Sequence, residues 1–361
     1  MLRRLHSKKE IHLDFRLESG YVFAMNNCEA IVFTGPNQVA LENLAMPAVG
    51  PGQLLVRTRR SLISIGTELT ALKADYPKGS NWEQRFTFPH HPGYSNIGEV
   101  IGLGEGTDKS WLGKIVASYG THARYVVVEA KEVVQVPAGV AEDQSAFFTI
   151  AHIVMNGLRR AKITWGESVV VYGLGLLGQL AAQFCHAAGA RPVFGVDISD
   201  FRLGLLPKKT GLVPLNPARE KVADRVRDLT RGRMADVVIE LTGNAGLIPS
   251  EFEPLKTQGR FVLLSSPRGK TTLDLHDLCN APSYTIVGAH NFSHPSVATP
   301  DNPWTIPRHN ELFFDLLLDG TLAVEQLITK RVSYKEAPQI YSGLVRDISG
   351  EMGIIFEWEL S

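Results

Sequence analysis

A β-branched run leads directly into a glycine loop in Ser168-Val169-Val170-Val171-Tyr172-Gly173-Leu174-Gly175-Leu176-Leu177-Gly178, and a helical pattern follows from Gln179 to Ala188. The pattern G-x-G-x-x-G between a strand and a helix is typical of a dinucleotide-binding turn. Gly173 permits the tight turn, Gly175 lets a pyrophosphate approach the backbone, and Gly178 lets the helix pack on the strand. Unpaired N–H groups at the helix amino terminus would bind the phosphates. Residues 173–178 are therefore predicted to bind a dinucleotide, the alternative being a tight turn that holds no ligand.

An acidic residue follows the next apolar run at the distance that this motif requires. Pro192–Val196 ends in Asp197, 24 residues after Gly173. A carboxylate at that place accepts hydrogen bonds from the ribose hydroxyls of the adenosine half, so the sequence predicts NAD(H) in preference to NADP(H). Ile198 and Arg202 follow closely and are predicted to line the adenosine end. Arg202 would favour NADP(H) if its charge outweighed that of Asp197.

Strands and helices alternate after the glycine loop. The strand-like runs are Ala235–Glu240, Gly259–Leu264 and Tyr284–Gly288. This rhythm predicts βαβ units and a parallel sheet, in which ligands bind beyond the carboxyl ends of the strands. The residues that follow these strands are predicted to line one crevice and to contact the cofactor: Thr242, Gly243, Ser265, Ser266 and His290.

Composition narrows the classes of function. The chain has 361 residues, 44% hydrophobic and 20% charged, which suits a protein of two globular domains. Lysine plus arginine and aspartate plus glutamate both number 37, so no basic excess indicates nucleic acid or a membrane as a partner. No apolar run approaches the ~20 residues of a membrane span. Three scattered cysteines suit a reducing compartment, so a cytoplasmic protein is expected.

Short strands broken by glycine and proline precede the glycine loop. They lie at 54–58, 96–102, 114–117 and 123–128. Such spacing is typical of a compact β-barrel-like domain. The segment after this domain is predicted to be helical from Asp143 to Lys162. The tail is predicted to contain a helix at Glu311–Leu318, a short helix near Lys335–Gly343 and a last strand at Gly353–Trp358.

This order resembles the medium-chain dehydrogenase/reductase superfamily from about Cys28 to Glu359. The motifs that carry the resemblance are Gly66-Thr67-Glu68, Pro92-Gly93-Tyr94-Ser95-Asn96-Ile97-Gly98, the glycine loop and Leu327-Ile328-Thr329. The stretch Ser61–Glu68 and the Pro-Gly-Tyr block look most like the branch that contains the bacteriochlorophyllide dehydrogenases.

The resemblance implies an α/β protein with a GroES-like β-barrel catalytic domain and a Rossmann doubly wound parallel sheet. The implied parts are an N-terminal extension at 1–27, the GroES-like domain at 28–155, the Rossmann domain at 156–295 and a return to the catalytic domain at 296–361. Relatives pair by extending the Rossmann sheet edge to edge, which implies a homodimer through residues 273–287.

The family's zinc ligands are replaced in this chain. Zinc alcohol dehydrogenases carry Cys in the block that matches residues 65–68 and His-Glu in the block that matches Tyr94-Ser95. The corresponding residues here are Ile65, Tyr94 and Ser95, and none of them is a usual zinc ligand. No cysteine lies between Cys28 and Cys185, so the family's four-cysteine structural zinc lobe is also missing. A site without metal is therefore expected.

The candidates for catalysis are Tyr94, His152 and Thr67. Tyr94 matches a lost metal ligand, so its hydroxyl would face the reacting centre, unless it is only a packed aromatic ring. His152 lies in a segment that passes the nicotinamide in relatives, and an imidazole that titrates near neutral pH suits a proton relay. The alternative for His152 is a hydrogen-bonded histidine in the domain junction. Thr67 is the hydroxyl donor to consider next.

Other polar residues of the first domain are expected to be mainly structural. In zinc relatives the acid that matches Glu68 usually has a supporting role, and the same is favoured here. Tyr119, His122 and Tyr125 fall in one strand-like stretch. Because side chains alternate along a strand, these three are not expected to line one cleft together.

The function predicted from the sequence is a zinc-independent oxidoreductase that transfers a hydride between NAD(P)(H) and a small or medium organic substrate. The resemblance favours a secondary alcohol or its ketone. The missing zinc ligands favour the alternative of an enone or quinone reductase. An alternative of another class is a non-catalytic dinucleotide-binding protein with a sensor or structural role.

Overall fold

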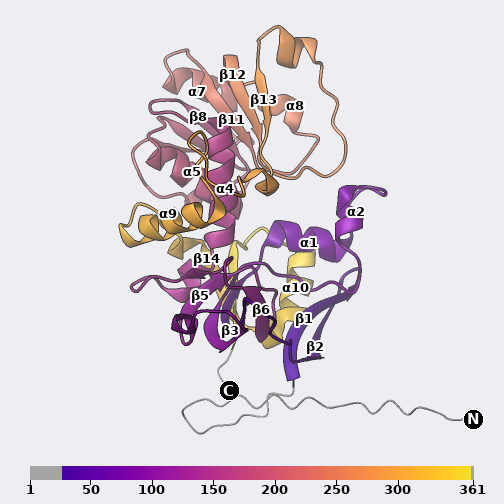
Figure 1. Ribbon diagram of the computed structural model, residues 1–361. Coiled ribbons are helices and arrows are strands. Elements are labelled where there is room, and N and C mark those ends of the chain that lie inside the picture. The colour runs from indigo at the N-terminus through magenta and orange to yellow at the C-terminus, as the bar shows by residue number, and fades with distance from the viewer. Residues whose placement is uncertain (1–26, 359–361) are drawn as a thin grey trace, which may run out of the picture.

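The computed structural model describes residues 27–358 and shows two domains stacked end to end (Figure 1). One surrounds a six-stranded sheet and the other a seven-stranded sheet. We call them the parallel-sheet domain and the mixed-sheet domain. Helices α4 (Phe148–Ala161) and α9 (Ile306–Leu318) pack on each other where the two domains meet. The predicted extension at residues 1–27 lies outside the described residues, apart from Asn27.

The parallel-sheet domain has the strand order β10-β9-β8-β11-β12-β13, and every neighbouring pair is parallel. Its strands are β8 (Val169–Tyr172), β9 (Val193–Val196), β10 (Leu212–Leu215), β11 (Ala235–Glu240), β12 (Leu255–Leu263) and β13 (Thr285–Gly288). The predicted Rossmann-type sheet and its strand at Ala235–Glu240 are confirmed.

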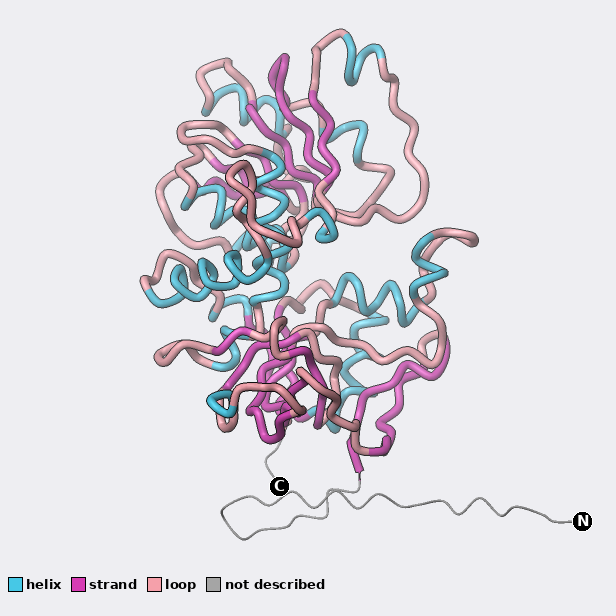
Figure 2. Tube along the Cα trace, in the orientation of Figure 1, coloured by secondary structure: helices cyan, strands magenta, loops and turns pink. Residues whose placement is uncertain are grey.

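Helices cover both faces of this sheet (Figure 2). The helices of the domain besides α4 are α5 (Leu176–Ala187), α6 (Asp200–Gly204), α7 (Val222–Leu229) and α8 (Ile248–Glu251). Val169 and Val171 pack with α4 and α5, whereas Val170 packs with α7 and α8. A strand buried on both faces needs a continuous apolar run, and this explains the valines before the glycine loop.

The mixed-sheet domain has the strand order β14-β15-β3-β4-β5-β7, and β6 also pairs with β3. Its strands are β3 (Gln53–Leu62), β4 (Asn96–Leu103), β5 (Ile115–Ser118), β6 (Tyr125–Glu129), β7 (Val134–Gln135), β14 (Ile328–Ser333) and β15 (Gly353–Glu357). Strand β15 runs parallel to β14 and antiparallel to β3. The predicted return of the tail to the first domain therefore places the last strand inside the sheet.

A two-stranded hairpin and three helices lie in the mixed-sheet domain besides these strands. They are β1 (Asn27–Gly35), β2 (Gln38–Ala45), α1 (Ile65–Lys73), α2 (Asn81–Arg85) and α10 (Ala337–Arg346). Phe33 of the hairpin packs edge-on against Tyr341 of α10, with ring centroids 5.0 Å apart. Phe356 of β15 belongs to the same buried cluster, so the two chain ends of this domain share one core.

The helix predicted at Asp143–Lys162 is two helices, α3 (Glu142–Ser145) and α4. At the break, the Ser95 hydroxyl donates to the Ala146 carbonyl. The Phe147 amide bonds three residues back, to Gln144, as at a tightened helix end. The predicted boundary between residues 155 and 156 falls inside α4.

Within residues 27–358, no helix is long and apolar enough to cross a membrane.

Candidate active site and cofactor crevice

The glycine loop joins β8 to α5, and its three glycines have different surroundings. Gly173 has φ +86°, and a Cβ atom there would lie 2.8 Å from the backbone of Leu241 and Thr242. A Cβ atom on Gly178 would lie 1.8 Å from the Gly173 carbonyl oxygen. A Cβ atom on Gly175 would meet no atom within 4 Å. Packing therefore requires glycine at 173 and 178, whereas the space at 175 is open on the side where a pyrophosphate would approach.

Asp197 lies at the carboxyl end of β9 and holds the loop in place. Its carboxylate accepts from the Leu174 amide at 2.8 Å and from the Ser199 amide at 2.9 Å. Arg202 lies 3.7 Å from the same carboxylate. Ile198, by contrast, is 76% exposed and offers an apolar surface next to the acid. The predicted adenosine-end residues are thus gathered around one turn.

Glu240, at the end of β11, joins the next two loops of the crevice. One carboxylate oxygen accepts from the Thr242 hydroxyl at 2.7 Å and from the Gly243 amide at 2.8 Å. The other accepts from the Ser265 hydroxyl. Three predicted cofactor residues are therefore anchored to one buried carboxylate. Glu240 was not predicted as a site residue, because it ends an apolar strand and no motif marks it.

A second buried acid, Glu251 of α8, lies near Glu240. It is 1% exposed, and neither carboxylate oxygen has a hydrogen-bond partner within the described residues. Burial, together with the charge of Glu240, raises the pKa of Glu251 to about 8. Glu251 is therefore protonated and neutral at neutral pH in the folded protein.

Glu251→Gln should raise the free energy of unfolding in alkaline solution. The folded protein keeps the Glu251 proton up to a pKa of about 8, against an ordinary value of 4.5. The raised pKa of Glu251 contributes stability to the folded protein. This contribution is fully present below pH 4.5, the ordinary pKa, and is lost as the pH rises through about 8. At pH 9 the variant should gain roughly 1–3 kcal/mol over the wild type, and the gain should vanish near pH 4.

Urea unfolding at several pH values measures this difference. Glu253→Gln, two residues away and exposed, is the matched control and should show no such pH dependence. An equal gain for Glu251→Gln at pH 4 and pH 9 would contradict the prediction.

Tyr94 and Thr67 lie together at the start of α1, on the mixed-sheet side. The Tyr94 hydroxyl donates to the Ser64 hydroxyl and lies 3.4 Å from the Thr67 hydroxyl. Burial raises the pKa of Tyr94 above its ordinary value, so the phenol is protonated at neutral pH. Ser64, the residue before α1, was not predicted as a site residue. Three hydroxyl groups are thus held close enough to share hydrogen bonds.

A buried carboxylate, that of Glu68, supports this hydroxyl cluster from behind. Glu68 accepts from the Ser64 amide at 2.8 Å and lies 3.2 Å from the His122 imidazole. Tyr341 of α10 donates to the same carboxylate. Burial alone would raise the pKa of Glu68, but the charge of His122 and these hydrogen bonds outweigh it and lower the pKa. Glu68 therefore fixes the backbone of Ser64, in agreement with its expected structural role.

The expectation that Tyr119, His122 and Tyr125 lie in one strand is wrong. Strand β6 begins at Tyr125, and the two other residues lie in the preceding loop. The reason is the His122 side chain, which bonds Ser61 at 2.8 Å in addition to its contact with Glu68, and this draws the loop inward.

His152, on α4, lies in a separate buried cluster that also includes residues of α9 and of the loop after β13. Its Nδ1 lies 3.1 Å from the Asn310 side-chain oxygen, and its ring is 5.5 Å from that of His294. Burial, followed by the nearby His294 and His309, lowers the pKa of His152 to about 3. His152 is therefore neutral near pH 7, where the predicted relay would need it to titrate. A role for this residue as a neutral hydrogen-bonding group stays a prediction.

The two domains contact each other across the crevice. Arg268, in the loop after β12, donates to the Thr70 hydroxyl of α1 at 2.7 Å. Arg85 at the end of α2 lies 5.8 Å from the ring centre of Phe292, in the loop after β13. His290 and Ser266, both predicted to contact the cofactor, are exposed in these loops.

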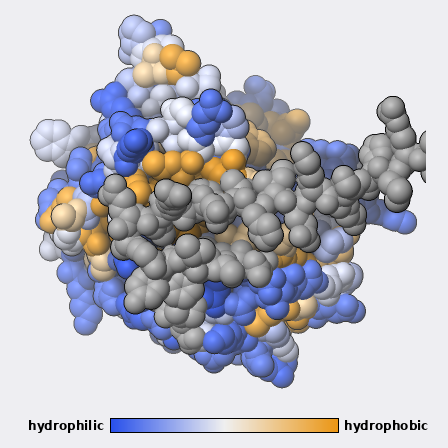
Figure 3. Space-filling view, turned by 60° about the horizontal axis from the view of Figure 1, so that its bottom comes forward, coloured by the Kyte–Doolittle hydropathy of each residue, from blue (hydrophilic) through white to orange (hydrophobic). Residues whose placement is uncertain are grey.

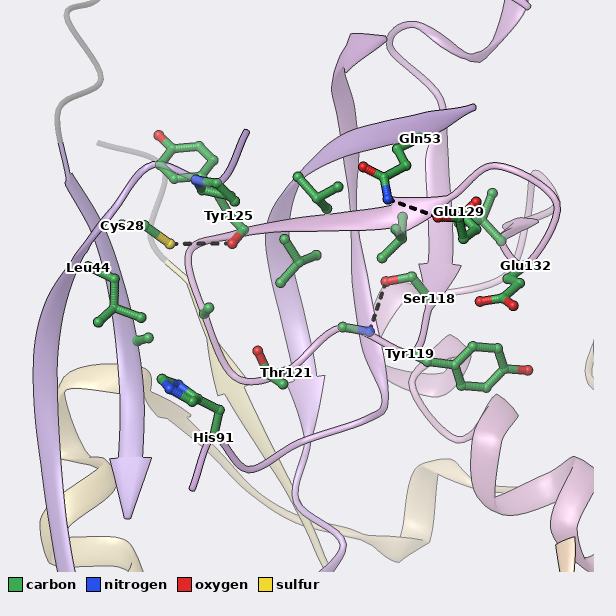
Figure 4. Close-up of a pocket in the computed structure, with 18 of the residues that line it drawn as sticks. Cys28, Leu44, Gln53, His91, Ser118, Tyr119, Thr121, Tyr125, Glu129 and Glu132 are labelled. Atoms are coloured by element: carbon green, nitrogen blue, oxygen red, sulfur yellow. Dashed lines mark hydrogen bonds between the residues drawn. The ribbon is translucent and has the colours of Figure 1, made fainter. Parts of the chain in front are cut away.

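A cavity of about 470 Å³ lies in the mixed-sheet domain, outside this site (Figure 4). Cys28, Leu44, His91, Tyr119 and Tyr125 are among its lining residues, and none of the predicted cofactor or catalytic residues lines it. Figure 3 looks onto the end of the molecule that this domain forms, where exposed apolar side chains are interspersed with hydrophilic ones.

Comparison with known proteins agrees with this architecture. Residues 177–301 match the family described as zinc-binding dehydrogenase. The 2R,3R-butanediol dehydrogenase of Bacillus subtilis superposes with a TM-score of 0.76 at 17% identity, over 92% of this chain and all of that one. A dehydrogenase of Escherichia coli CFT073, in complex with NADH, superposes with a TM-score of 0.75 at 16% identity, again over 92% and 100%.

A curated relative covers nearly the whole chain. The D-guloside 3-dehydrogenase of Escherichia coli K12 is 27% identical over 351 residues, which cover 90% of this chain and 99% of the relative. The chain is an oxidoreductase with the medium-chain dehydrogenase fold. The range that matches the zinc-binding dehydrogenase family lies beyond Ile65, Tyr94 and Ser95, so it says nothing about the positions of the metal ligands. Within residues 27–358, no group of three or more His, Cys, Asp or Glu side chains could hold a metal ion.

Proposed function

We propose that this oxidoreductase transfers a hydride between NAD(H) and a secondary alcohol of a small polar molecule. The observation that carries the proposal is the cluster of Tyr94, Ser64 and Thr67 hydroxyls at the start of α1. The names of the guloside and butanediol dehydrogenases support an alcohol as the substrate class. The resemblance to the bacteriochlorophyllide branch also indicates an alcohol, but the ring substrate of that branch stays a prediction.

The crevice fits a dinucleotide on the chemistry of its residues. The open space at Gly175 leaves room for a pyrophosphate, and the α5 amino terminus provides N–H groups for it. Asp197 would accept from the ribose, with Ile198 and Arg202 beside the adenine. Thr242, Gly243, Ser265, Ser266 and His290 would line the nicotinamide half. When bound, the nicotinamide supplies the group that takes or gives the hydride.

Tyr94 is the proposed hydrogen-bond donor to the substrate oxygen. Since its pKa is raised, the phenol keeps its proton at neutral pH and can donate to an oxygen on which negative charge develops. In the structure that proton is directed to Ser64, so Ser64 orients the phenol before the substrate arrives. Thr67 would supply a second hydroxyl to the same oxygen. These roles need no metal ion.

Zinc independence is part of the proposal and is supported by what surrounds the three replaced positions. Ile65 packs against an apolar cluster, Tyr94 bonds Ser64, and Ser95 bonds the Ala146 carbonyl. Purified protein is expected to contain less than about a tenth of a zinc ion per chain and to keep its activity after treatment with a chelator. Elemental analysis measures this. One zinc per chain that is lost together with activity would contradict it.

NAD(H) is expected to bind more tightly than NADP(H), roughly tenfold to hundredfold, because a 2′-phosphate would meet the Asp197 carboxylate. Titration of both cofactors by fluorescence measures the preference. Asp197→Asn keeps an acceptor for the Leu174 amide but removes the charge, so it should narrow the difference. Tighter binding of NADP(H) by the wild type would show that Arg202 dominates.

The specific alternative is reduction of an enone or a quinone, which the loss of the zinc ligands at Ile65, Tyr94 and Ser95 favours. Turnover of a panel of secondary alcohols, enones and quinones with NAD(H) separates the two activities. Bound cofactor without turnover of any of them would contradict both substrate classes.

We also propose a cytoplasmic homodimer. Strand β13 is an edge strand of the parallel sheet, and Leu275 and Ile286 in the predicted pairing segment are 65% and 36% exposed. A second copy that extends the sheet at this edge would cover them. Sedimentation equilibrium of the purified chain tests the dimer, and a monomer would refute it.

A further inference from the structure

We propose that a pocket at the amino-terminal edge of the parallel sheet binds a small phosphate-bearing anion. The pocket has a volume of about 310 Å³. Its lining residues are Arg191, Pro192, Thr210, Gly211, Leu229, Arg231 and Arg233. Three arginines thus line one concave surface, and none of the lining residues is an aspartate or a glutamate.

These three arginines differ from most of the other arginines because their side chains have no partner among the described residues. Arg57 and Arg260, for example, form ion pairs of 2.9 and 2.6 Å. Within residues 27–358, the side chains of Arg191, Arg231 and Arg233 have no ion pair, hydrogen bond or ring contact. The formal net charge of the chain is zero, so the local excess of positive charge is not part of a general basicity.

The pocket is separate from the cofactor crevice. Arg191 precedes β9, and the segment of Arg231 and Arg233 precedes β11, so all three residues lie where parallel strands begin. The cofactor crevice lies where these strands end, at Gly173 and Asp197. The two sites therefore lie at opposite ends of the strands of the same sheet.

The chemistry of the lining residues indicates the class of ligand. A guanidinium group presents two parallel N–H donors that match the oxygens of a phosphate group. Gly232 has φ +81°, and this turn brings Arg231 and Arg233 into the same pocket. Three positive charges call for a ligand with two or more negative charges. Leu229, which is 39% exposed, and Pro192 offer an apolar surface for a carbon portion.

Calorimetric titration with pyrophosphate and with inorganic phosphate, at about 0.15 M ionic strength, tests the proposal. Saturable binding of pyrophosphate is expected in the wild type. Arg231→Gln combined with Arg233→Gln should weaken it by roughly tenfold or more. Arg346→Gln, which removes one exposed arginine at the end of α10, is the matched control and should leave it unchanged. Arg191→Gln comes from another segment and gives an independent measurement if the double variant does not fold.

Pyrophosphate could also bind at the glycine loop, and Gly175→Val distinguishes that site from the arginine pocket. The substitution should abolish binding at the glycine loop and leave binding at the arginine pocket intact. Inorganic phosphate alone, bound as tightly as pyrophosphate, would identify a single-phosphate ligand and still support the site. No saturable binding in the wild type would overturn the proposal. Affinity that is unchanged in both the double variant and Arg191→Gln, or reduced equally in Arg346→Gln, would overturn it too.

Discussion

Gly175→Val is expected to abolish binding of NAD(H) while the protein stays folded. A Cβ atom on residue 175 would meet no atom of the protein within 4 Å, so the substitution should cost little in packing. It would instead fill the space that the pyrophosphate needs against the backbone. Affinity should fall by more than about a hundredfold, since both the close approach and the amide hydrogen bonds would be lost. Titration of NADH fluorescence, with circular dichroism to follow the fold, measures both effects.

Two other glycines make this experiment specific. Gly343→Val, in α10, also enters open space and should leave the affinity for NAD(H) unchanged. Gly178→Ala should instead destabilise the domain, because its Cβ atom would lie 1.8 Å from the Gly173 carbonyl oxygen. If Gly175→Val bound NADH within about twofold of the wild type, the phosphates would have to bind elsewhere.

Tyr94→Phe should lower kcat by roughly a hundredfold or more on a secondary alcohol, with the affinity for NAD(H) unchanged. The phenylalanine ring keeps the packing but removes the donor that would stabilise charge on the substrate oxygen. Ser64→Ala should lower kcat less, since it removes only the group that orients the phenol. Steady-state kinetics with separate cofactor titration measures these changes.

Tyr284→Phe is the matched control for Tyr94→Phe. Its hydroxyl donates to the Leu255 carbonyl at 3.1 Å, in the parallel-sheet domain and away from the hydroxyl cluster. Loss of that bond should leave kcat unchanged. A Tyr94→Phe enzyme with at least half of the wild-type kcat would reduce Tyr94 to a packing residue and leave Thr67 as the donor to test.

The parallel-sheet domain was largely predictable because its signals are local. The valine run, the glycine loop and Asp197 lie within thirty residues of one another. The alternation of strands and helices then predicted that the later strands run parallel. Thr242 and Ser265, which follow two of these strands, were therefore expected at the same end of the sheet. Glu240 carried no local signal, because an acid that ends a buried strand reveals its hydrogen bonds only when the loops are folded around it.

The mixed-sheet side of the site depends on contacts that are distant in sequence. Tyr341 reaches Glu68 across 273 residues. Helix α1 was not predicted, because Gly66 lies in its first turn and lowers the helix propensity of the segment. The helix is stabilised by apolar contacts with α10 that no short pattern encodes. Ser64 could therefore be recognised only from the folded structure.

The position of β15 has a consequence for how the chain is made. This strand is formed by residues 353–357, yet it pairs on one side with β3, which is synthesised at residues 53–62. On a ribosome the six strands of the parallel-sheet domain emerge as one uninterrupted stretch and can assemble at once. Strand β6 pairs with residues 53–57 of the earlier-made β3, but residues 60–62 of β3 have to wait for their partner until residues 353–357 have been made. A chain that lacked residues 353–357 would thus carry a finished parallel-sheet domain attached to a mixed sheet in which residues 60–62 of β3 have lost a strand partner.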